Sequence, residues 1–351
     1  MDLFDRELKL SDFRFQLPKN LIAKFPTTPR DACKLMVLHR DTQEIEDRKF
    51  YEIHEYFQKG DCIVLNETKV FPARLIGQKE KTGAKIEVLL LRELNPVDKI
   101  WDVIVEPARK VRIGNKIYFD EGLVCEIIDN TTSRGRTVRF LTDKDVFSIV
   151  EKIGTVPLPP YIKREPVSND KKNYQTVYAK VAGSVAAPTA GLHFTSQLLK
   201  KIEKKGVKIV PVILHIGLGT FRPVEVEDLT KHRMDSEYYE ISASTAEVIN
   251  KTITSKGRVF SVGTSTVRAL ETSVTASGLC AHNRGWTDKF IFPPYNFKIV
   301  DHLITNFHAP ESTLLMLVAA FAGYEFTMKA YKKAIKDGYR FLSYGDAMLI
   351  L

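Results

Sequence analysis

The sequence lacks any apolar run long enough to cross a bilayer. The longest such run, residues 314–322, fits a buried helix instead. The first residues contain neither a basic region nor an apolar stretch, which argues against a secretory signal. We therefore expect a cytoplasmic protein that does not associate with a membrane.

Cysteine is scarce, with four residues in a chain of 351, and none of them forms a CxxC pair. The sequence thus indicates reduced thiols and gives no sign of a disulfide framework or a zinc site. No HExxH pattern is present, and the histidines are too far apart for a sequence-local metal site. We expect no metal; the histidines that stand beside other polar residues are at positions 193, 215, 232 and 308.

Three nucleotide-binding and catalytic patterns are also absent. The chain has no GxxxxGK[ST] loop and no GxSxG elbow, so neither a P-loop nor an α/β-hydrolase is indicated. Gly217 and Gly219 match the first two glycines of GxGxxG, but Pro223 follows where a helix would have to run. A Rossmann dinucleotide site is therefore not expected.

Positive charge is in excess, with a net charge of +9 and a pI of about 9.1. The basic residues are spread along the chain, with small groups near positions 79–81, 109–112, 134–136 and 200–201. This balance is compatible with a phosphate-rich partner, which would be bound with release of counterions. A solvated basic surface explains it equally well, so charge alone does not decide.

Short strands fill the first part of the chain. Apolar and β-branched runs predict strands at 34–39, 62–65, 86–91, 100–105, 116–119, 124–128 and 137–140. Turn signals separate the strands from about 67 to 152, and helical patterns are nearly absent there. This segment is therefore predicted to form a small antiparallel barrel or sandwich.

The pattern changes after a proline-rich segment at 154–160, which can continue neither a helix nor a central strand. Helices are predicted at about 196–205, 242–255, 267–276 and 327–336, with another entered through Pro310. Strands are predicted between them at 207–214, 258–262 and 303–307. The alternation favours an α/β domain with parallel strands. We expect a barrel-like α/β domain formed by 1–65 and 154–351, with 66–153 inserted as a small antiparallel β-barrel domain.

Two blocks, 183–195 and 214–223, each run small residues and glycines into a histidine and an aromatic residue. Glycine lets the backbone approach a ligand closely, and histidine can exchange a proton near neutral pH. A segment that only packs a core would carry more bulk. The blocks therefore predict the rim of an active site.

Two further segments lie where strands run into helices, the position at which α/β folds bind ligands. Residues 262–266 place glycine and hydroxyl groups at a helix start, which suits either an anion or ordinary capping. Residues 305–312 end a strand in Asn306 and His308. The run 232–240 combines a histidine with carboxylates, which suits proton transfer or a charged surface loop.

Taken together, these segments resemble the S-adenosylmethionine:tRNA ribosyltransferase-isomerases of queuosine biosynthesis. The resemblance covers nearly the whole chain in order, including the final motif at 343–348. The matching segments are 12–18, 21–23, 66–70, 72–75, 157–162, 174–178, 186–194, 214–223, 262–270, 305–315 and 339–348.

The resemblance implies an enzyme that transfers and isomerises the ribosyl part of S-adenosylmethionine onto 7-aminomethyl-7-deazaguanine at the tRNA wobble position. The products are epoxyqueuosine in tRNA, adenine and methionine. It also implies an α/β-barrel-like domain with an inserted β-barrel, no cofactor beyond S-adenosylmethionine as a consumed substrate, and a monomer that binds the tRNA anticodon loop.

The chemistry suggests which residues act. The sulfonium acidifies the neighbouring C5′ hydrogens, so a general base can begin the rearrangement, and a proton donor helps adenine to leave. We place Glu237, with Asp235 or His232, near the proton transfer, and expect His193, His215 and His308 to hold adenine, ribose or the incoming base. The candidate catalytic residues are Glu237, Asp235, His193 and His215.

Further residues of these motifs are candidates for binding. Those expected to bind S-adenosylmethionine or the base are Thr189, Gly191, Phe194, Gly217, Gly219, Thr220, Phe221, Tyr238, Gly263, Thr264, Arg268, Asn306, His308 and Ser312. Those expected to contact tRNA are Lys69, Arg74, Arg109, Lys110, Arg112, Arg134 and Arg136.

The chain departs from the family pattern in three places. Asp235 occupies the histidine position of the common Met-His-x-Glu motif, so either this histidine is not essential or the aspartate substitutes for it. Lys69 stands where arginine is common and loses the bidentate geometry for phosphate. Leu218 stands where alanine is common.

A competing interpretation is a non-catalytic RNA-binding protein on the same architecture. It would explain the charge and the β-rich insertion. It would not explain the glycine–histidine blocks in the α/β part of the chain.

Overall fold

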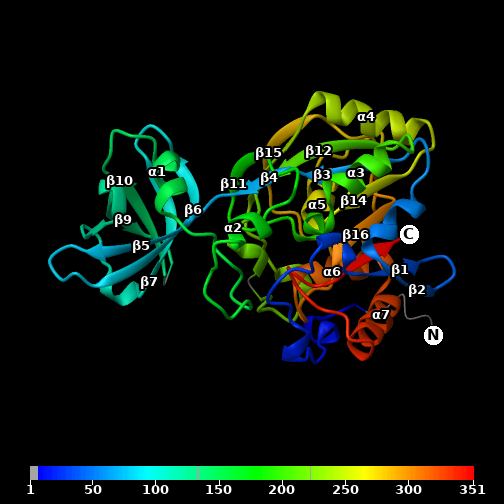
Figure 1. The fold of residues 1–351 in the computed structure, drawn as a ribbon, viewed down its shortest axis with the longest axis horizontal. Coiled ribbons are helices and arrows are strands. Elements are labelled where there is room, and N and C mark those ends of the chain that lie inside the picture. Colours follow the sequence, from blue (N-terminus) through cyan, green and yellow to red (C-terminus); the bar gives the residue numbers. More distant parts are fainter. Residues whose placement is uncertain (1–6, 133, 222) are drawn as a thin grey trace.

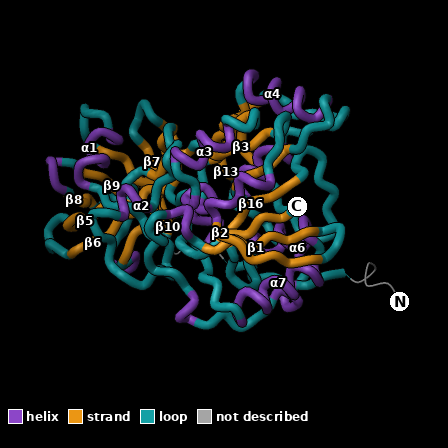
Figure 2. The backbone as a smooth tube through the Cα atoms, turned by 45° about the vertical axis from the view of Figure 1, so that its right-hand side comes forward, coloured by secondary structure: helices purple, strands orange, loops and turns teal. Residues whose placement is uncertain are grey.

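The computed structural model describes residues 7–132, 134–221 and 223–351, and for Thr220 and Phe221 it describes the backbone only. A small β-barrel lies to one side of a larger α/β body (Figure 1). Figure 2 shows the sheet of the larger body with helices packed around it. The fold class expected from the sequence is confirmed.

The barrel is closed and antiparallel, with the strand order β10-β7-β6-β5-β8-β9. Burial alternates along β6 and β7, so one side of each strand faces the barrel core, where Trp101 is buried. One helix, α1 (Val146–Ile153), follows the last strand and starts at Asp145, whose side chain caps it. The barrel strands are β5 (Arg74–Lys79), β6 (Lys85–Asn95), β7 (Ile100–Glu106), β8 (Lys116–Tyr118), β9 (Val124–Asn130) and β10 (Gly135–Phe140).

The larger body is built on a sheet with the order β15-β13-β12-β3-β14-β16-β17-β1-β2. The pairs β12–β3, β3–β14, β14–β16 and β1–β17 are parallel, whereas the remaining pairs are antiparallel. The sheet is thus mixed, which corrects the expectation of parallel strands throughout. Its strands are β1 (Lys34–His39), β2 (Glu44–Lys49), β3 (Cys62–Asn66), β12 (Lys208–Leu214), β13 (Glu237–Ile241), β14 (Val259–Val262), β15 (Asn283–Thr287), β16 (His302–Asn306) and β17 (Ala347–Ile350).

Helices follow or precede these strands largely where their sequence signals lie. Thr195, Ser242 and Ser312 cap α3, α4 and α6 through their side chains. Helix α5 begins three residues earlier than expected and ends at Thr272, because Gly263 at φ 89° turns the chain directly out of β14. The helices of this body are α2 (Asp170–Asn173), α3 (Ser196–Glu203), α4 (Ala243–Thr254), α5 (Thr264–Thr272), α6 (Thr313–Ala322) and α7 (Tyr324–Lys336).

Two short strands lie between the barrel and the α/β body. β4 (Thr68–Val70) leads into the barrel, and β11 (Val181–Ser184) follows after the chain has returned to the body. They pair in parallel as a separate two-stranded sheet (Figure 1). The outgoing and returning segments themselves are joined where the backbones of Arg74 and Thr155 exchange two hydrogen bonds.

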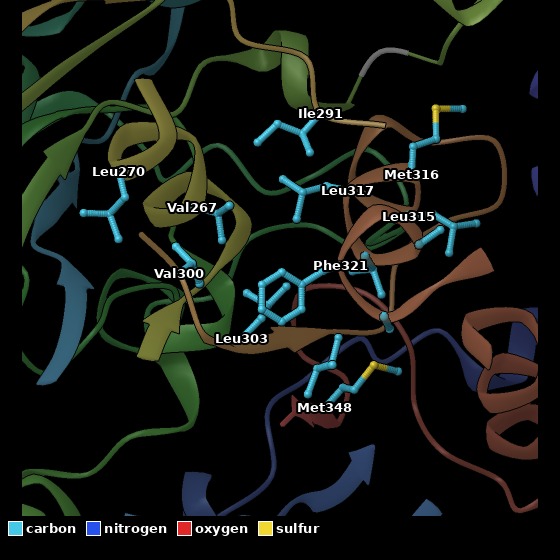
Figure 3. Packing of buried hydrophobic residues seen from close by; sticks show 14 of the residues in the cluster. Val267, Leu270, Ile291, Val300, Leu303, Leu315, Met316, Leu317, Phe321 and Met348 are labelled. Atoms are coloured by element: carbon cyan, nitrogen blue, oxygen red, sulfur yellow. The ribbon is translucent and has the colours of Figure 1, made fainter. Parts of the chain in front are cut away.

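The core of the α/β body lies between α5, α6 and the sheet. Figure 3 shows Val267 and Leu270 of α5, Leu317 and Phe321 of α6, and Leu303 of β16 gathered in one cluster. All are buried. Both helices are thus fixed by apolar packing at the strand ends from which they start.

Among the described residues, no single helix is long and apolar enough to span a membrane. Helices α6 and α7 pass that test only as a pair, and they are bent by 115° at the break between them.

Shortening a buried side chain in this cluster should destabilise the protein. For Leu303→Ala we expect a loss of about 2–5 kcal/mol in the free energy of unfolding, because the mutation removes buried methyl groups and leaves a cavity. Urea denaturation followed by circular dichroism measures it. Val97→Ala is the control, since Val97 is 87% exposed, and it should stay within about 0.5 kcal/mol of the wild type. An equal loss in both variants would contradict the packing argument.

Candidate active site

A cavity of about 190 Å³ opens where β13, β14 and β16 meet the loops at one edge of the sheet. Small and polar side chains form much of its wall. The residues that line it are Tyr161, Ala186, Ala187, Pro188, Thr189, Ala190, Ile216, Pro223, Glu237, Gly263, Thr264, Ser265, Arg268, Thr305, Asn306, His308, Ala309, Pro310, Glu311, Ser312, Leu314, Leu342 and Ser343.

Glu237 supplies a buried carboxylate to this wall. Its Oε1 accepts a hydrogen bond of 2.7 Å from the backbone N–H of Gly217, and its Oε2 pairs with the guanidinium of Arg268. Both side chains are about 95% buried, with exposed fractions of 5% and 4%. Arg268 also donates to the carbonyl oxygens of Lys289 at 2.9 Å and Thr287 at 3.3 Å. The pair is therefore held at both ends, as a buried ion pair must be.

For residues 232–240 the sequence allowed either proton transfer or a charged surface loop, and only part of this segment is a surface loop. Glu237 begins β13, and strand alternation turns Glu237 inward and Tyr238 outward. Asp235 lies before the strand, exposed, and packs against Gly219 outside the cavity. His232 also lies outside it, edge-on to the ring of Phe290.

His193 lies behind the cavity wall in a buried hydrogen-bond chain. Asn306 donates from Nδ2 to His193 Nε2 at 3.1 Å and to the carbonyl of Leu342 at 3.3 Å, and its Oδ1 accepts from Thr189 at 2.9 Å. Because Nε2 accepts, Nδ1 carries the proton and faces Cys33 Sγ at 3.2 Å. Burial lowers the pKa of His193 to about 3. His193 is thus neutral and orients Asn306, which does line the cavity.

His308 lines the cavity directly. Its Nε2 hydrogen-bonds to the hydroxyl of Thr305 at 2.8 Å, and its backbone N–H donates to Tyr331 at 3.0 Å. Burial lowers the pKa of His308 to about 3. A neutral imidazole at this position can donate to or accept from a ligand without carrying charge.

Two residues on the cavity wall adopt left-handed backbone conformations that are costly for side chains with a Cβ. Glu311 has φ 56° and Leu342 has φ 69°. Hydrogen bonds enforce both, since Glu311 N–H donates to Phe13 and Leu342 N–H to Phe307. Strained backbone of this kind is concentrated at functional sites.

His215 lies on the opposite side of the sheet from this cavity. It follows β12, bonds to the hydroxyl of Thr68 through Nδ1 at 2.8 Å, and stacks on Tyr238 with ring centroids 5.7 Å apart. Burial lowers its pKa to about 4. The structure therefore brings His215 and Tyr238 together, but away from Glu237.

The other residues expected to bind substrate divide into three groups. The first group lines the cavity and consists of Thr189, Gly263, Thr264, Arg268, Asn306, His308 and Ser312. Gly191 packs against the hydroxyl of Tyr178 and Phe194 packs on Phe50 in the core, so both support the wall from behind. Gly217 and Gly219 contact Glu237 and Asp235 respectively, and the side chains of Thr220 and Phe221 lie outside the described part of the structure.

The residues expected to contact tRNA also differ in their surroundings. Arg109, Lys110 and Arg112 are exposed together on the barrel, and Arg134 is exposed beside Glu106. Lys69 lies 3.7 Å from Glu151, and Arg74 pairs with Glu87 and Glu165.

Arg136 requires a correction. It is 7% exposed, and its guanidinium donates to the backbone carbonyls of Gly135, Ala108 and Val111. It stabilises the barrel loops and is withdrawn from the set of RNA contacts.

Sequence reasoning missed several residues of the wall. Tyr161 and Ser343 line the cavity and are joined by a 2.5 Å hydrogen bond between their hydroxyls. Both belong to segments that carry the family resemblance, so the resemblance could have identified them. Ser265 was missed as well, although it faces the cavity and accepts from the buried amide of Asn66 at 3.1 Å.

Among the residues that the structure describes, no group of three or more His, Cys, Asp or Glu side chains could hold a metal ion.

The fold and the cavity define an α/β protein with an inserted β-barrel and a polar site at the strand ends, the arrangement that binds small ligands in α/β folds. The model of the queuosine biosynthesis protein family matches residues 10–350. The chain belongs to this family.

Its relatives cover it almost completely. The S-adenosylmethionine:tRNA ribosyltransferase-isomerase of Chloroherpeton thalassium is 62% identical over 98% of this chain and 100% of its own length. That of Cytophaga hutchinsonii is 58% identical, with the same coverage. The crystal structure of the S-adenosylmethionine tRNA ribosyltransferase from Thermotoga maritima is 40% identical, covers 97% of this chain and 100% of that chain, and gives a TM-score of 0.56.

The lowered pKa of His193 predicts a pH-dependent stability. The unfolded chain binds a proton at this histidine below about pH 6.5 and the folded protein does not until about pH 3, so stability is lost as pH falls between these values. Between pH 7.5 and pH 5 one such histidine costs about 2 kcal/mol. His193→Gln should lose less stability over this range than the wild type, as measured by urea denaturation at both pH values.

The matched control is His282→Gln, since His282 is exposed. This variant should keep the pH dependence of the wild type. An unchanged pH dependence in His193→Gln would contradict the neutral state assigned to His193.

Proposed function

We propose that the chain is an S-adenosylmethionine:tRNA ribosyltransferase-isomerase. It transfers and isomerises the ribosyl part of S-adenosylmethionine onto 7-aminomethyl-7-deazaguanine in tRNA, with release of adenine and methionine. Support comes from membership of the queuosine biosynthesis family and from the names of relatives that match over nearly the whole chain. No finding favours the alternative of a non-catalytic RNA-binding protein.

The observation that carries the assignment of roles is the Glu237–Arg268 pair in the cavity wall. Arg268 places a guanidinium beside the buried carboxylate of Glu237, and Gly217 fixes one of its oxygens. A fixed carboxylate favours a sulfonium cation nearby and is a proton acceptor for the acidified C5′ position. Glu237 is therefore the general base or the counter-ion of the sulfonium.

The opposite wall suits the neutral parts of the substrate. Thr189 and Asn306 present hydroxyl and amide groups that hydrogen-bond a base or a ribose, and His308 presents a neutral imidazole. Thr264 and Ser312 stand at the starts of α5 and α6, where free N–H groups favour the carboxylate of the methionine part. In this proposal His193 positions the side chain of Asn306. Asp235 and His215 lie outside the cavity and have no part in binding its contents.

The partners follow from this reaction. S-adenosylmethionine is consumed as a substrate, and tRNA is bound through its anticodon loop, with the inserted segment 66–153 forming a separate RNA-contacting domain beside 1–65 and 154–351. We expect a monomer that works in the cytoplasm, where both substrates occur.

Replacing the buried carboxylate tests the proposed role of Glu237. Glu237→Gln keeps the shape and an acceptor for Gly217 but loses the charge, so adenine release from S-adenosylmethionine should slow by at least about a hundredfold. The measurement is chromatographic detection of adenine after incubation with S-adenosylmethionine and tRNA that carries the aminomethyl-deazaguanine. Glu247→Gln is the control, since Glu247 is exposed on α4 and lies outside the cavity, and it should react at the wild-type rate.

Full turnover by Glu237→Gln would remove this residue from the reaction. A wild-type protein that binds the tRNA without releasing adenine would instead contradict the enzymatic function.

Binding of tRNA should weaken steeply as salt rises. With about four phosphate contacts, the dissociation constant should increase about a hundredfold between 50 and 200 mM salt. Replacing Arg109, Lys110 and Arg112 together by alanine should reduce the slope of log Kd against log salt by about 2–3. The slope falls because fewer counterions leave the RNA when three phosphate contacts are lost. Filter binding at several salt concentrations measures both.

The matched control replaces three exposed lysines of α7, Lys329, Lys332 and Lys336, on the side of the α/β body away from the barrel (Figure 1). The same charge is removed, and the slope should not change. A flat salt dependence of the wild type, or equal slopes for both triple variants, would contradict RNA contact through this barrel surface.

A further inference from the structure

A row of three rings crosses the sheet next to the barrel, on the face opposite Glu237. His215 stacks on Tyr238 with ring planes 23° apart, and Tyr238 meets Trp286 edge to face with centroids 5.8 Å apart. The register explains the row, since Tyr238 lies opposite Trp286 in the β13–β15 ladder and the backbone of His215 bonds to that of Tyr238. Strands β13 and β15 and the residue that follows β12 thus contribute one ring each to the same face.

The row is rigid before any partner binds. His215 is confined between Tyr238 and the backbone of Gly183, where a Cβ would lie 2.6 Å from its ring, and Thr68 bonds to its Nδ1. The hydroxyl of Tyr238 donates to Glu240 at 2.9 Å. Little side-chain entropy would therefore be lost on binding a partner.

The outer end of the row is exposed and carries positive charge. Trp286 is 52% exposed on β15, at the edge of the sheet. Arg92 reaches from β6 of the barrel and lies over the indole ring, 4.9 Å from its centroid. Arg284 is exposed two residues before Trp286 and points to the same side of β15, with Glu240 as the carboxylate beside it. An exposed indole with one guanidinium over its ring and a second arginine on the same side of the strand is unusual for a surface that only contacts water.

We propose that His215, Tyr238, Trp286 and Arg92 form a stacking surface for an unpaired base of a single-stranded RNA loop. Aromatic rings bind such bases by their faces, and the guanidinium groups neutralise the phosphates on either side of the base. The row and Glu237 lie on opposite faces of β13, so the base bound here is a different one from the base that reacts. The proposal rests on the proposed function only for the identity of the RNA.

The two tryptophans of the chain permit a direct test, because Trp101 is buried in the barrel and Trp286 is exposed. An RNA hairpin with the anticodon-loop sequence should quench the fluorescence of Trp286. A fully paired RNA duplex of equal length should not. Quenching of the same size by the duplex would overturn the proposal.

Affinity for the hairpin gives a second readout. Trp286→Ala should raise its dissociation constant about tenfold, as expected for the loss of one stacked base. Trp286→Phe should recover most of the affinity, because it keeps a ring. Tyr51→Ala is the matched control, since Tyr51 is an exposed aromatic residue (49%) on η5 (Phe50–Tyr56), an element of the α/β body outside the ring row, and it should bind like the wild type.

Adenine release separates this proposal from the proposed function. In Trp286→Ala the KM for tRNA should rise while the KM for S-adenosylmethionine stays unchanged. If the wild type turns over but Trp286→Ala binds the hairpin as tightly as the wild type, the stacking surface is wrong and the function stands. If the hairpin quenches Trp286 but the wild type releases no adenine, the surface stands and the function is wrong. Loss of self-association in Trp286→Ala without any effect on RNA would assign the row to a second copy of the chain and overturn the proposal.

Discussion

The ion pair between Glu237 and Arg268 is the interaction on which the site depends. It joins β13 to α5, and through the carbonyl groups of Thr287 and Lys289 it also ties both to the end of β15. Removing one partner of a buried pair costs about 3–5 kcal/mol, because the other charge stays buried without compensation. A pair of this kind is more costly than apolar packing at the same place. Its presence in the wall of a cavity therefore supports the proposed role of the Glu237 carboxylate.

Strand ends could be predicted from the sequence, and with them the segments that bring Gly263, Thr264, Asn306 and His308 to the cavity wall. Thr264, Asn306 and His308 follow apolar strands, and the ends of parallel strands meet at one edge of a sheet. The segments that line the cavity were thus identified before any geometry was known. The inserted all-β domain was also predictable, because closely spaced strands with turns between them indicate a small antiparallel barrel or sandwich. The family resemblance favoured the barrel.

The direction of each side chain could not be predicted in the same way. His193 and His215 belong to similar glycine-rich blocks, yet Asn306 holds one behind the cavity and Thr68 holds the other on the far face of the sheet. Strand β13 was missed because its five residues, Glu-Tyr-Tyr-Glu-Ile, carry two carboxylates and no apolar run, a composition that a charged loop shares. Arg136 was misassigned because sequence does not show whether a guanidinium meets solvent or backbone carbonyls. These choices are made by tertiary contacts between distant segments.

The backbone hydrogen bonds between Arg74 and Thr155 have a consequence for the inserted domain. A long excursion of the chain normally carries an entropic cost for bringing its two ends together. Here the outgoing and returning segments are already joined at the base of the barrel, so two connected segments hold the barrel. Two bonded segments resist rotation more than a single linker does. They therefore set the spacing between barrel and body, and an RNA that contacts both would have to match that spacing.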